Sequence, residues 1–138
     1  AMDRYLERLK HYLPVQVHYV KPEKIAAGTN ENIVRIRESE RVEKLFNHQG
    51  HLAVLDPGGR EFDSQGFSRF LRKLMDSGAS GLWFVVGGPM GLSEELLKKA
   101  DTAISLSKMT LAHDMARLVL LEQTYRAFTI MRGEPYHK

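Results

Sequence analysis

A loop of small residues is the first candidate ligand site in the chain. Gly87, Gly88, Pro89 and Gly91 follow an apolar run at residues 82–86, whose β-branched and aromatic side chains and short length predict a buried strand. Glycine at the carboxyl end of such a strand lets a ligand approach the backbone, because no Cβ stands in the way. The same pattern is also typical of a turn that binds nothing, and it contains no GxGxxG or GK[ST] phosphate motif. The loop alone therefore leaves both interpretations open.

A second loop of this kind follows further along the chain. Residues 103–106 are apolar and predict another strand, and the small and polar residues 107–110 come directly after it. Between the two strands, Ser93, Glu94 and Glu95 have the pattern of a helix N-cap with an acidic first turn. Open α/β sheets bind ligands at the carboxyl ends of their strands. The two loops therefore predict one pocket built from both.

Residues at the two ends of a long predicted helix are the other candidates for chemistry. His113 lies at the start of the helix predicted at residues 111–132, and Arg117 follows one turn later on the same face. His113 could contact a cofactor or a target base, or it could only hydrogen-bond the helix start. Beyond the far end of the helix, Tyr136 and His137 follow a proline. We expect this tail to be extended, to project off the helix and to contribute little to stability.

The predicted strands and helices that must position these residues alternate along the chain. This alternation predicts a single α/β domain over residues 1–138, with a mostly parallel sheet and helices on both faces. Matched acidic and basic residues on one helix predict a solvated face with local ion pairs. The last helix is apolar almost all round, which predicts that a partner subunit covers part of it. The predicted strands are residues 15–20, 51–55, 82–86 and 103–106, a tight turn occupies 56–59, and the predicted helices are 3–13, 31–46, a helix between Asp63 and Gly78, and 111–132.

Composition narrows the class of protein. The 138 residues are 43% hydrophobic and 27% charged, as in ordinary soluble domains. The absence of cysteine excludes disulfides and thiolate metal sites, and no cluster of other metal ligands stands out in the sequence. The net charge of +3 permits nucleic-acid binding without demonstrating it. Because no apolar run is long enough to span a membrane and no signal peptide begins the chain, we expect a cytoplasmic protein without a membrane partner.

Four motifs of the C-terminal half carry a family resemblance. They are LDPGG at 55–59, VVGGPMG at 85–91, ISLSKMTLAH at 104–113 and RLVLLEQTYRAFTIMRGEPYHK at 117–138. In this order they resemble the ribosomal large subunit methyltransferase H family, which belongs to the knotted SPOUT methyltransferases. The resemblance is strong over roughly the last ninety residues and looser before them. Members of that family open with an additional strand and a glycine-containing loop, so we expect that this chain lacks the family's N-terminal strand.

The resemblance implies a site for S-adenosylmethionine beside a C-terminal trefoil knot, in which the last helix threads through the preceding loops. The tail of Tyr136, His137 and Lys138 would bind RNA over the active site of the partner subunit. His137 would then share the electrostatic work of catalysis with His113 and Arg117. The implied cofactor-binding residues are Leu55, Gly87, Leu106, Ser107, Lys108, Met109, Thr110 and Leu111.

The activity implied by this resemblance is methylation of N3 of a pseudouridine in 23S ribosomal RNA, by a homodimer that acts on assembled ribosomes with S-adenosylmethionine as donor. No metal is required for that reaction. Two other functions stay open. One is a module of the same fold that binds ribosomal RNA without transferring a methyl group. The other is an unrelated α/β nucleotide-binding protein, which is disfavoured because its phosphate-binding motifs are absent.

Overall fold

A small parallel sheet lies at the centre of the computed structural model, which describes residues 1–47 and 49–137. Strand β1 (His51–Glu61) lies between β2 (Leu82–Val85) and β3 (Thr102–Ser105), in the order β2-β1-β3. Both neighbours run parallel to β1, so the carboxyl ends of all three strands meet at the same edge. The predicted parallel sheet is therefore confirmed, with the strands after β1 correct to within one residue.

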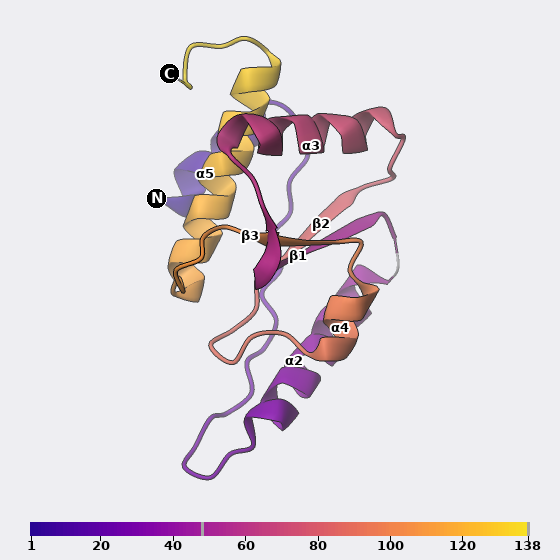
Figure 1. Ribbon diagram of the computed structural model, residues 1–138, viewed down its shortest axis with the longest axis vertical. Helices are drawn as coiled ribbons and strands as arrows, with labels where there is room; N and C mark the ends of the chain where they lie inside the picture. Colours follow the sequence, from indigo (N-terminus) through magenta and orange to yellow (C-terminus); the bar gives the residue numbers. More distant parts are fainter. Residues whose placement is uncertain (48, 138) are drawn as a thin grey trace.

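Helices surround this sheet, and their ends follow local capping chemistry (Figure 1). Asn30, Asp63 and Ser93 each accept backbone N–H hydrogen bonds as the N-caps of α2, α3 and α4. These caps fix the helix starts that the sequence predicted. The helices are α1 (Met2–Leu9), α2 (Glu31–Phe46), α3 (Ser64–Asp76), α4 (Glu94–Lys99) and α5 (His113–Met131).

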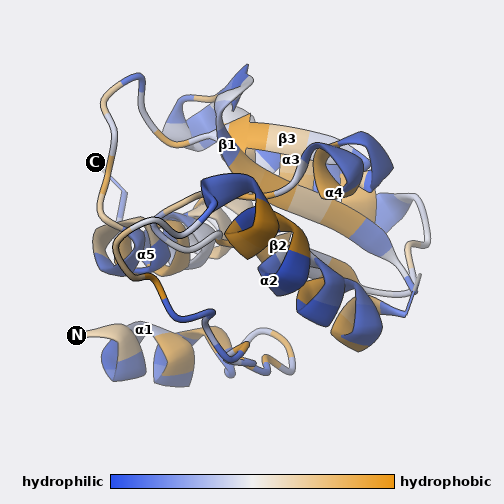
Figure 2. Ribbon diagram, turned by 90° about the horizontal axis from the view of Figure 1, so that it is seen from below, coloured by the Kyte–Doolittle hydropathy of each residue, from blue (hydrophilic) through white to orange (hydrophobic). Residues whose placement is uncertain are grey.

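The helices cover both faces of the sheet, because alternate residues of β1 point to opposite sides. Leu52 and Val54 pack in one core with Phe46 of α2 and Leu96 of α4. Ala53 packs in the other core, which joins β3 to α1, α3 and α5. Figure 2 shows the mostly apolar strands enclosed by helices that carry both polar and apolar sides. The predicted layers are confirmed. Among the described residues, no helix is both long and apolar enough to cross a membrane.

The strand predicted at residues 15–20 is wrong, because no strand among the described residues pairs with this segment. Its alternating pattern describes extended backbone, which becomes a strand only where a neighbour pairs with it. Residues 14–20 instead form an irregular connection. Val15 packs against the core, while Tyr19 is 69% exposed, and the His18 ring stacks on Trp83 with centroids 6.1 Å apart.

The strand predicted at 51–55 continues past its expected end. Its pairing with β3 shifts register between Leu55 and Arg60, and both of these residues pair with Ile104. The intervening loop lies so close to β3 that a Cβ on Gly59 would come within 2.6 Å of its backbone. The predicted turn is thus an irregularity inside β1, which bends without ending.

Candidate functional site at the carboxyl edge of the sheet

Three chain segments predicted to bind a cofactor meet at the carboxyl edge of the sheet. Leu55 pairs with Ile104 of β3, and Leu106 lies two residues beyond that position. Val54 pairs with Val85 at the end of β2, and Gly87 lies two residues further on. The register therefore places these three segments side by side, as the sequence predicted. Leu55 and Leu106 are half-buried against the core, so core packing accounts for part of their environment.

The loop after β2 is a tight turn whose backbone conformation and packing favour glycine. The N–H of Gly91 donates to the carbonyl of Gly88 at 2.9 Å, and Gly91 has φ +82°. A Cβ on Gly87 would come within 3.1 Å of the Leu92 side chain, and one on Gly88 would come within 3.2 Å of the Glu38 carboxylate. The turn's own packing therefore favours glycine at both positions, whether or not a ligand approaches.

Helix α2 holds this turn in place, a role that sequence reasoning missed. Ser39 is 2% exposed, and its Oγ accepts a hydrogen bond of 2.9 Å from the N–H of Ser93. Nη1 of Arg35 donates to the carbonyl of Met90 at 3.2 Å. The predicted solvated face with local ion pairs is confirmed in part, by the i,i+4 pair of Arg35 with Glu31, but α2 also contacts distant parts of the chain. Glu23, which precedes α2 in the chain, forms ion pairs with both Arg37 and Arg41 of the helix. The hydrogen bond from Arg41 lowers the pKa of the Glu23 carboxyl group.

The loop after β3 places several polar groups at the same edge. The Ser107 carbonyl accepts from the Ser105 hydroxyl at 3.0 Å, and Ser107 Oγ accepts from the N–H of Met109 at 3.0 Å. Lys108 and Thr110 are exposed, and Lys108 Nζ lies 4.0 Å from a Glu61 carboxylate oxygen. This loop therefore presents backbone groups beside the ends of β1 and β3. Of its predicted apolar walls, Leu111 is half-buried, whereas Met109 is 78% exposed.

At the start of α5, one carboxylate gathers the two predicted catalytic residues. His113 Nε2 lies 3.3 Å from Asp114 Oδ1, and Arg117 pairs with the same oxygen. The guanidinium carbon of Arg117 lies 5.4 Å from the centre of the Tyr19 ring. Its Nε is buried and has no hydrogen-bond partner among residues 1–47 and 49–137. The structure thus brings His113 and Arg117 together, and the Asp114 that links them was recognisable from its i,i+3 spacing to Arg117.

The C-terminal tail folds back onto α5, and the expected projection away from the helix is wrong. The Tyr136 ring packs edge-on against Tyr125 with centroids 4.8 Å apart, and its hydroxyl donates to Glu122 at 3.3 Å. Arg126 lies 4.8 Å from the same ring, and its Nη1 is 3.0 Å from His137 Nδ1. Proline restricts the backbone before Tyr136, but it does not prevent these contacts. Lys138, the third predicted tail residue, lies outside the described residues.

Two tyrosines at the docked tail, Tyr136 and Tyr12, have raised pKa values because their hydroxyl groups are partly buried. Burial, and then a hydrogen bond with Tyr5, raise the pKa of Tyr136 to about 12. Burial, and then a hydrogen bond to Glu134, raise the pKa of Tyr12 to about 12 as well, with 2.8 Å between that hydroxyl and the carboxylate. The hydrogen bond from Arg126 to Glu122 raises the pKa of the arginine. Both tyrosines are therefore neutral donors near neutral pH.

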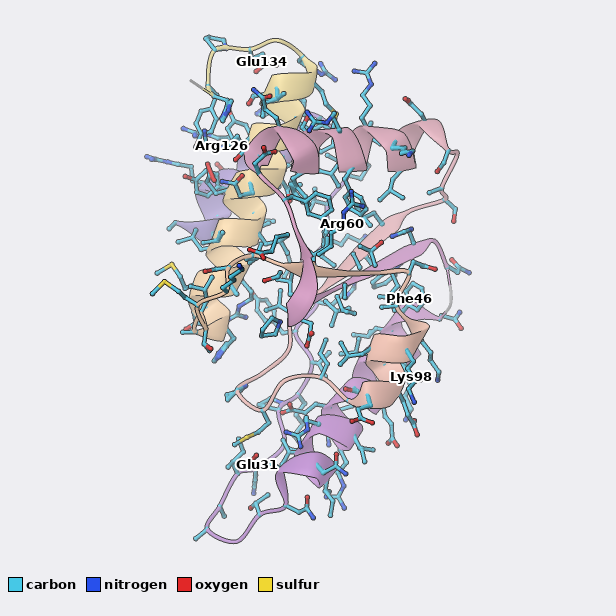
Figure 3. The ribbon with its side chains drawn as sticks, in the orientation of Figure 1. Glu31, Phe46, Arg60, Lys98, Arg126 and Glu134 are labelled. Atoms are coloured by element: carbon cyan, nitrogen blue, oxygen red, sulfur yellow. The ribbon has the colours of Figure 1, made fainter. Side chains whose placement is uncertain are left out.

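The tail and the edge loops lie near opposite ends of α5 in one protomer. His137 contacts Arg126, which is thirteen residues beyond His113 on α5. At about 1.5 Å of rise per residue, the two positions are roughly 20 Å apart along the helix axis. Figure 3 shows Arg126 and Glu134 near the end of α5 that is far from the loop after β3. The structure therefore does not bring His137 together with His113 and Arg117 within one chain.

Comparison with known proteins identifies the family. A family model described as "Predicted SPOUT methyltransferase" matches residues 1–137. The chain belongs to the SPOUT methyltransferase family. Curated relatives carry the name "Ribosomal RNA large subunit methyltransferase H". The one from Syntrophobacter fumaroxidans is 48% identical, covering 100% of this chain and 88% of the relative. The one from Christiangramia forsetii is 42% identical over 96% of this chain and 85% of the relative, and one from Clostridium kluyveri is 40% identical over 100% and 89%.

A SPOUT methyltransferase needs a methyl donor, and the residues at the sheet edge fit such a group. The loops after β2 and β3 bring backbone groups together there, and Leu55 and Leu106 supply half-buried apolar surface. The unpartnered buried Nε of Arg117 is a further group that a polar ligand could satisfy. The part of the chain that the structure describes contains no cluster of ligands that would hold a metal ion.

Proposed function

We propose that this protein methylates N3 of a pseudouridine in 23S ribosomal RNA, with S-adenosylmethionine as donor. The observation that carries the proposal is the meeting of three loops at one sheet edge, in a SPOUT chain that aligns over its full length with relatives named for large subunit ribosomal RNA. We assign cofactor contact to Leu55, Gly87 and the loop from Leu106 to Leu111. The trefoil knot belongs to this proposal and is supported by the SPOUT family match over residues 1–137.

The bound donor would supply an electrophilic methyl group on a sulfonium sulfur. The chain must then align the nucleobase nitrogen with that methyl and favour loss of the N3 proton. Arg117 is suited to the second task, because its positive charge stabilises the deprotonated imide. Asp114 holds the Arg117 guanidinium and the His113 imidazole at one carboxylate oxygen.

We further propose that the active site is completed by a second copy of the chain. Within one protomer, most of α5 separates the tail from His113. The tail of a partner subunit is not attached to that helix, so it can lie beside His113. Exposed apolar side chains at the start of α5 support a partner there, since Met109 is 78% and Met115 is 50% exposed. In this homodimer, Tyr136 stacks on the target base, while His137 and Lys138 contact RNA. The protein would work in the cytoplasm, where ribosomes are found.

Methyl transfer to purified ribosomes tests the reaction. Ribosomes from cells that lack this enzyme should gain labelled methyl from S-adenosylmethionine, and mapping should place it on N3 of one pseudouridine in 23S RNA. Ribosome binding without transfer would favour the alternative of an RNA-binding module. Transfer to another atom or RNA would overturn the assigned substrate.

Mixed dimers test the shared active site. The Arg117→Ala and His137→Ala variants should each be nearly inactive alone. When co-expressed and randomly paired, about half of the dimers are mixed, and each of these holds one intact site, so about a quarter of wild-type activity should return. Mixing each variant with itself is the control. No recovery in confirmed mixed dimers would show that Arg117 and His137 do not act across the interface.

A further inference from the structure

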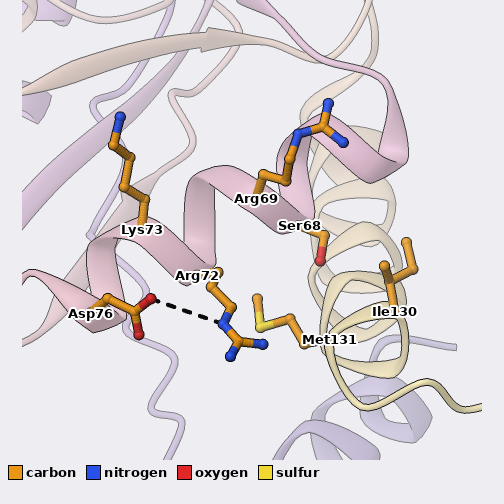
Figure 4. A pocket seen from close by; sticks show the side chains of 7 residues that line it. All are labelled: Ser68, Arg69, Arg72, Lys73, Asp76, Ile130 and Met131. Atoms are coloured by element: carbon orange, nitrogen blue, oxygen red, sulfur yellow. Dashed lines mark ion pairs between the residues drawn. The ribbon is translucent and has the colours of Figure 1, made fainter.

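A concave surface lies between α3 and the last turn of α5, away from the site at the sheet edge. It is an open depression of about 470 Å³, at the far end of α5 from the loop after β3. Ile130 and Met131 of α5 form its apolar side. Helix α3 contributes the polar side, where Figure 4 shows Arg69 and Lys73 extending to one side of the helix, apart from Arg72. We call this surface the α3–α5 groove.

The groove carries more positive charge than the structure neutralises. Arg69 and Lys73 are exposed and one helical turn apart, and neither pairs with a carboxylate among residues 1–47 and 49–137. Arg72 Nε lies 3.9 Å from Asp76 Oδ2, but their side chains are 62% and 74% exposed. Such exposed ion pairs contribute little and open readily. Arg69, Arg72 and Lys73 therefore all line the depression, and within the described part of the chain only Arg72 has a carboxylate partner, which holds it weakly.

The scaffold beneath these cations is rigid. The buried hydroxyl of Ser68 donates to the Ala127 carbonyl of α5 at 2.9 Å. Phe67 and Leu71 of α3 are buried in the core that contains Phe128 of α5. The backbone that carries Arg69 and Lys73 is therefore fixed, and only their long side chains adjust. A fixed row of cations with flexible ends suits a repeating anion better than a single buried ligand.

We propose that the α3–α5 groove binds the sugar–phosphate backbone of the substrate RNA. The inference rests on the proposed function, which supplies a polyanionic substrate that complements the charge of the groove. The C-terminal tail begins directly after Met131, at the end of the groove. A dimer in which this tail reaches the partner's active site would bring the groove next to that site. RNA held by one protomer would thus present its target base to the other.

Charge removal in the groove, compared with charge removal elsewhere, tests this inference. The test variant is Arg69→Gln with Lys73→Gln. The control is Lys44→Gln with Lys98→Gln, which removes the same charge from exposed positions on α2 and α4, and Figure 3 shows Lys98 away from the groove. Binding to ribosomes is measured over a salt series, together with kcat and KM for methyl transfer. S-adenosylmethionine binding and thermal unfolding confirm that each variant is folded.

Two lost phosphate contacts should lower the slope of log affinity against log salt by about 1.4, which corresponds to roughly 25-fold weaker binding near 0.1 M salt. The test variant should show this loss as a higher KM with unchanged kcat, and the control should match the wild type. Equal salt slopes in the test and control variants would overturn the groove assignment, even if both methylate ribosomes. If the groove variant shows the expected change in salt slope but the wild-type protein transfers no methyl group to ribosomes, the groove assignment stands and the proposed reaction is overturned.

Discussion

Replacing Tyr136 with alanine should destabilise the protein, although only two residues follow Tyr136 in the sequence. Its ring packs edge-on against Tyr125, which is typically worth about 1 kcal/mol beyond burial. The Arg126 cation adds about 0.5–1 kcal/mol at a partly exposed ring, and the hydroxyl bond to Glu122 adds about 0.5–1.5 kcal/mol. Since the three contacts share neighbours, their effects do not add fully. We expect Tyr136→Ala to lower the free energy of unfolding by about 2 kcal/mol.

Tyr136→Phe is the matched control, because it keeps the ring contacts and removes only the hydroxyl. It should cost about 0.5–1 kcal/mol, at most half of the alanine effect. Unfolding in urea, followed by circular dichroism at one fixed protein concentration, measures both differences. The concentration is held constant because a dimer would make stability depend on it.

The result that would refute this reasoning is a Tyr136→Ala protein as stable as the wild type. The tail would then not be held on α5 in solution, as the sequence alone had suggested. A second readout separates stability from function. If Tyr136 also stacks on the target base, then Tyr136→Ala should lose methyl transfer at temperatures where it stays folded. Tyr136→Phe should keep most of that activity.

Three further predictions follow from the site. Ser39→Ala leaves the buried N–H of Ser93 without its acceptor, so it should lower the free energy of unfolding by about 1–3 kcal/mol and weaken S-adenosylmethionine binding. Thermal unfolding and calorimetry measure the two effects, and unchanged values would mean that α2 does not hold the glycine turn. Gly87→Val should lower the melting temperature, because its branched carbons meet Leu92, and a fully stable variant would contradict this. The raised pKa of Tyr12, about 12 against an ordinary 10.0, favours the neutral form in the folded state, so stability should fall as pH rises from about 10 to 12 and fall less in Tyr12→Phe.

Local chemistry in the sequence was enough for most of the fold. The bounds of α2 follow from the cap at Asn30 and the left-handed Asn47 after its last residue, so the predicted range of 31–46 is confirmed. The short apolar runs after α3 became parallel strands, because a buried strand needs only a neighbour and cover on both faces. The segment at 15–20 shows the limit of this reasoning, since its alternation cannot reveal that no strand lies beside it.

Contacts between distant parts of the chain could not be predicted from the single sequence. Ser39 carries no local sign that it accepts from Ser93, and Arg35 carries none that it reaches the carbonyl of Met90. The folding back of Tyr136 depends on an aromatic and a charged partner that are adjacent on α5, Tyr125 and Arg126. The edge loops were predictable for the opposite reason. Parallel strands bring their carboxyl ends together whatever their side chains are.

The order of the strands also bears on how the protein is made. Among residues 1–47 and 49–137, β1 comes before β2 and β3 in the chain and lies between them in the sheet, so the two strands that pair with its edges are synthesised after it. Pairing with β3 joins residues about fifty positions apart, such as Leu52 and Asp101, which meet through a hydrogen bond of 2.8 Å. The edge of β1 that pairs with β2 can be filled once β2 has been made, whereas the edge that pairs with β3 stays unpaired until β3 has been translated. An apolar strand with an unpaired edge is prone to aggregation and is a natural binding site for chaperones.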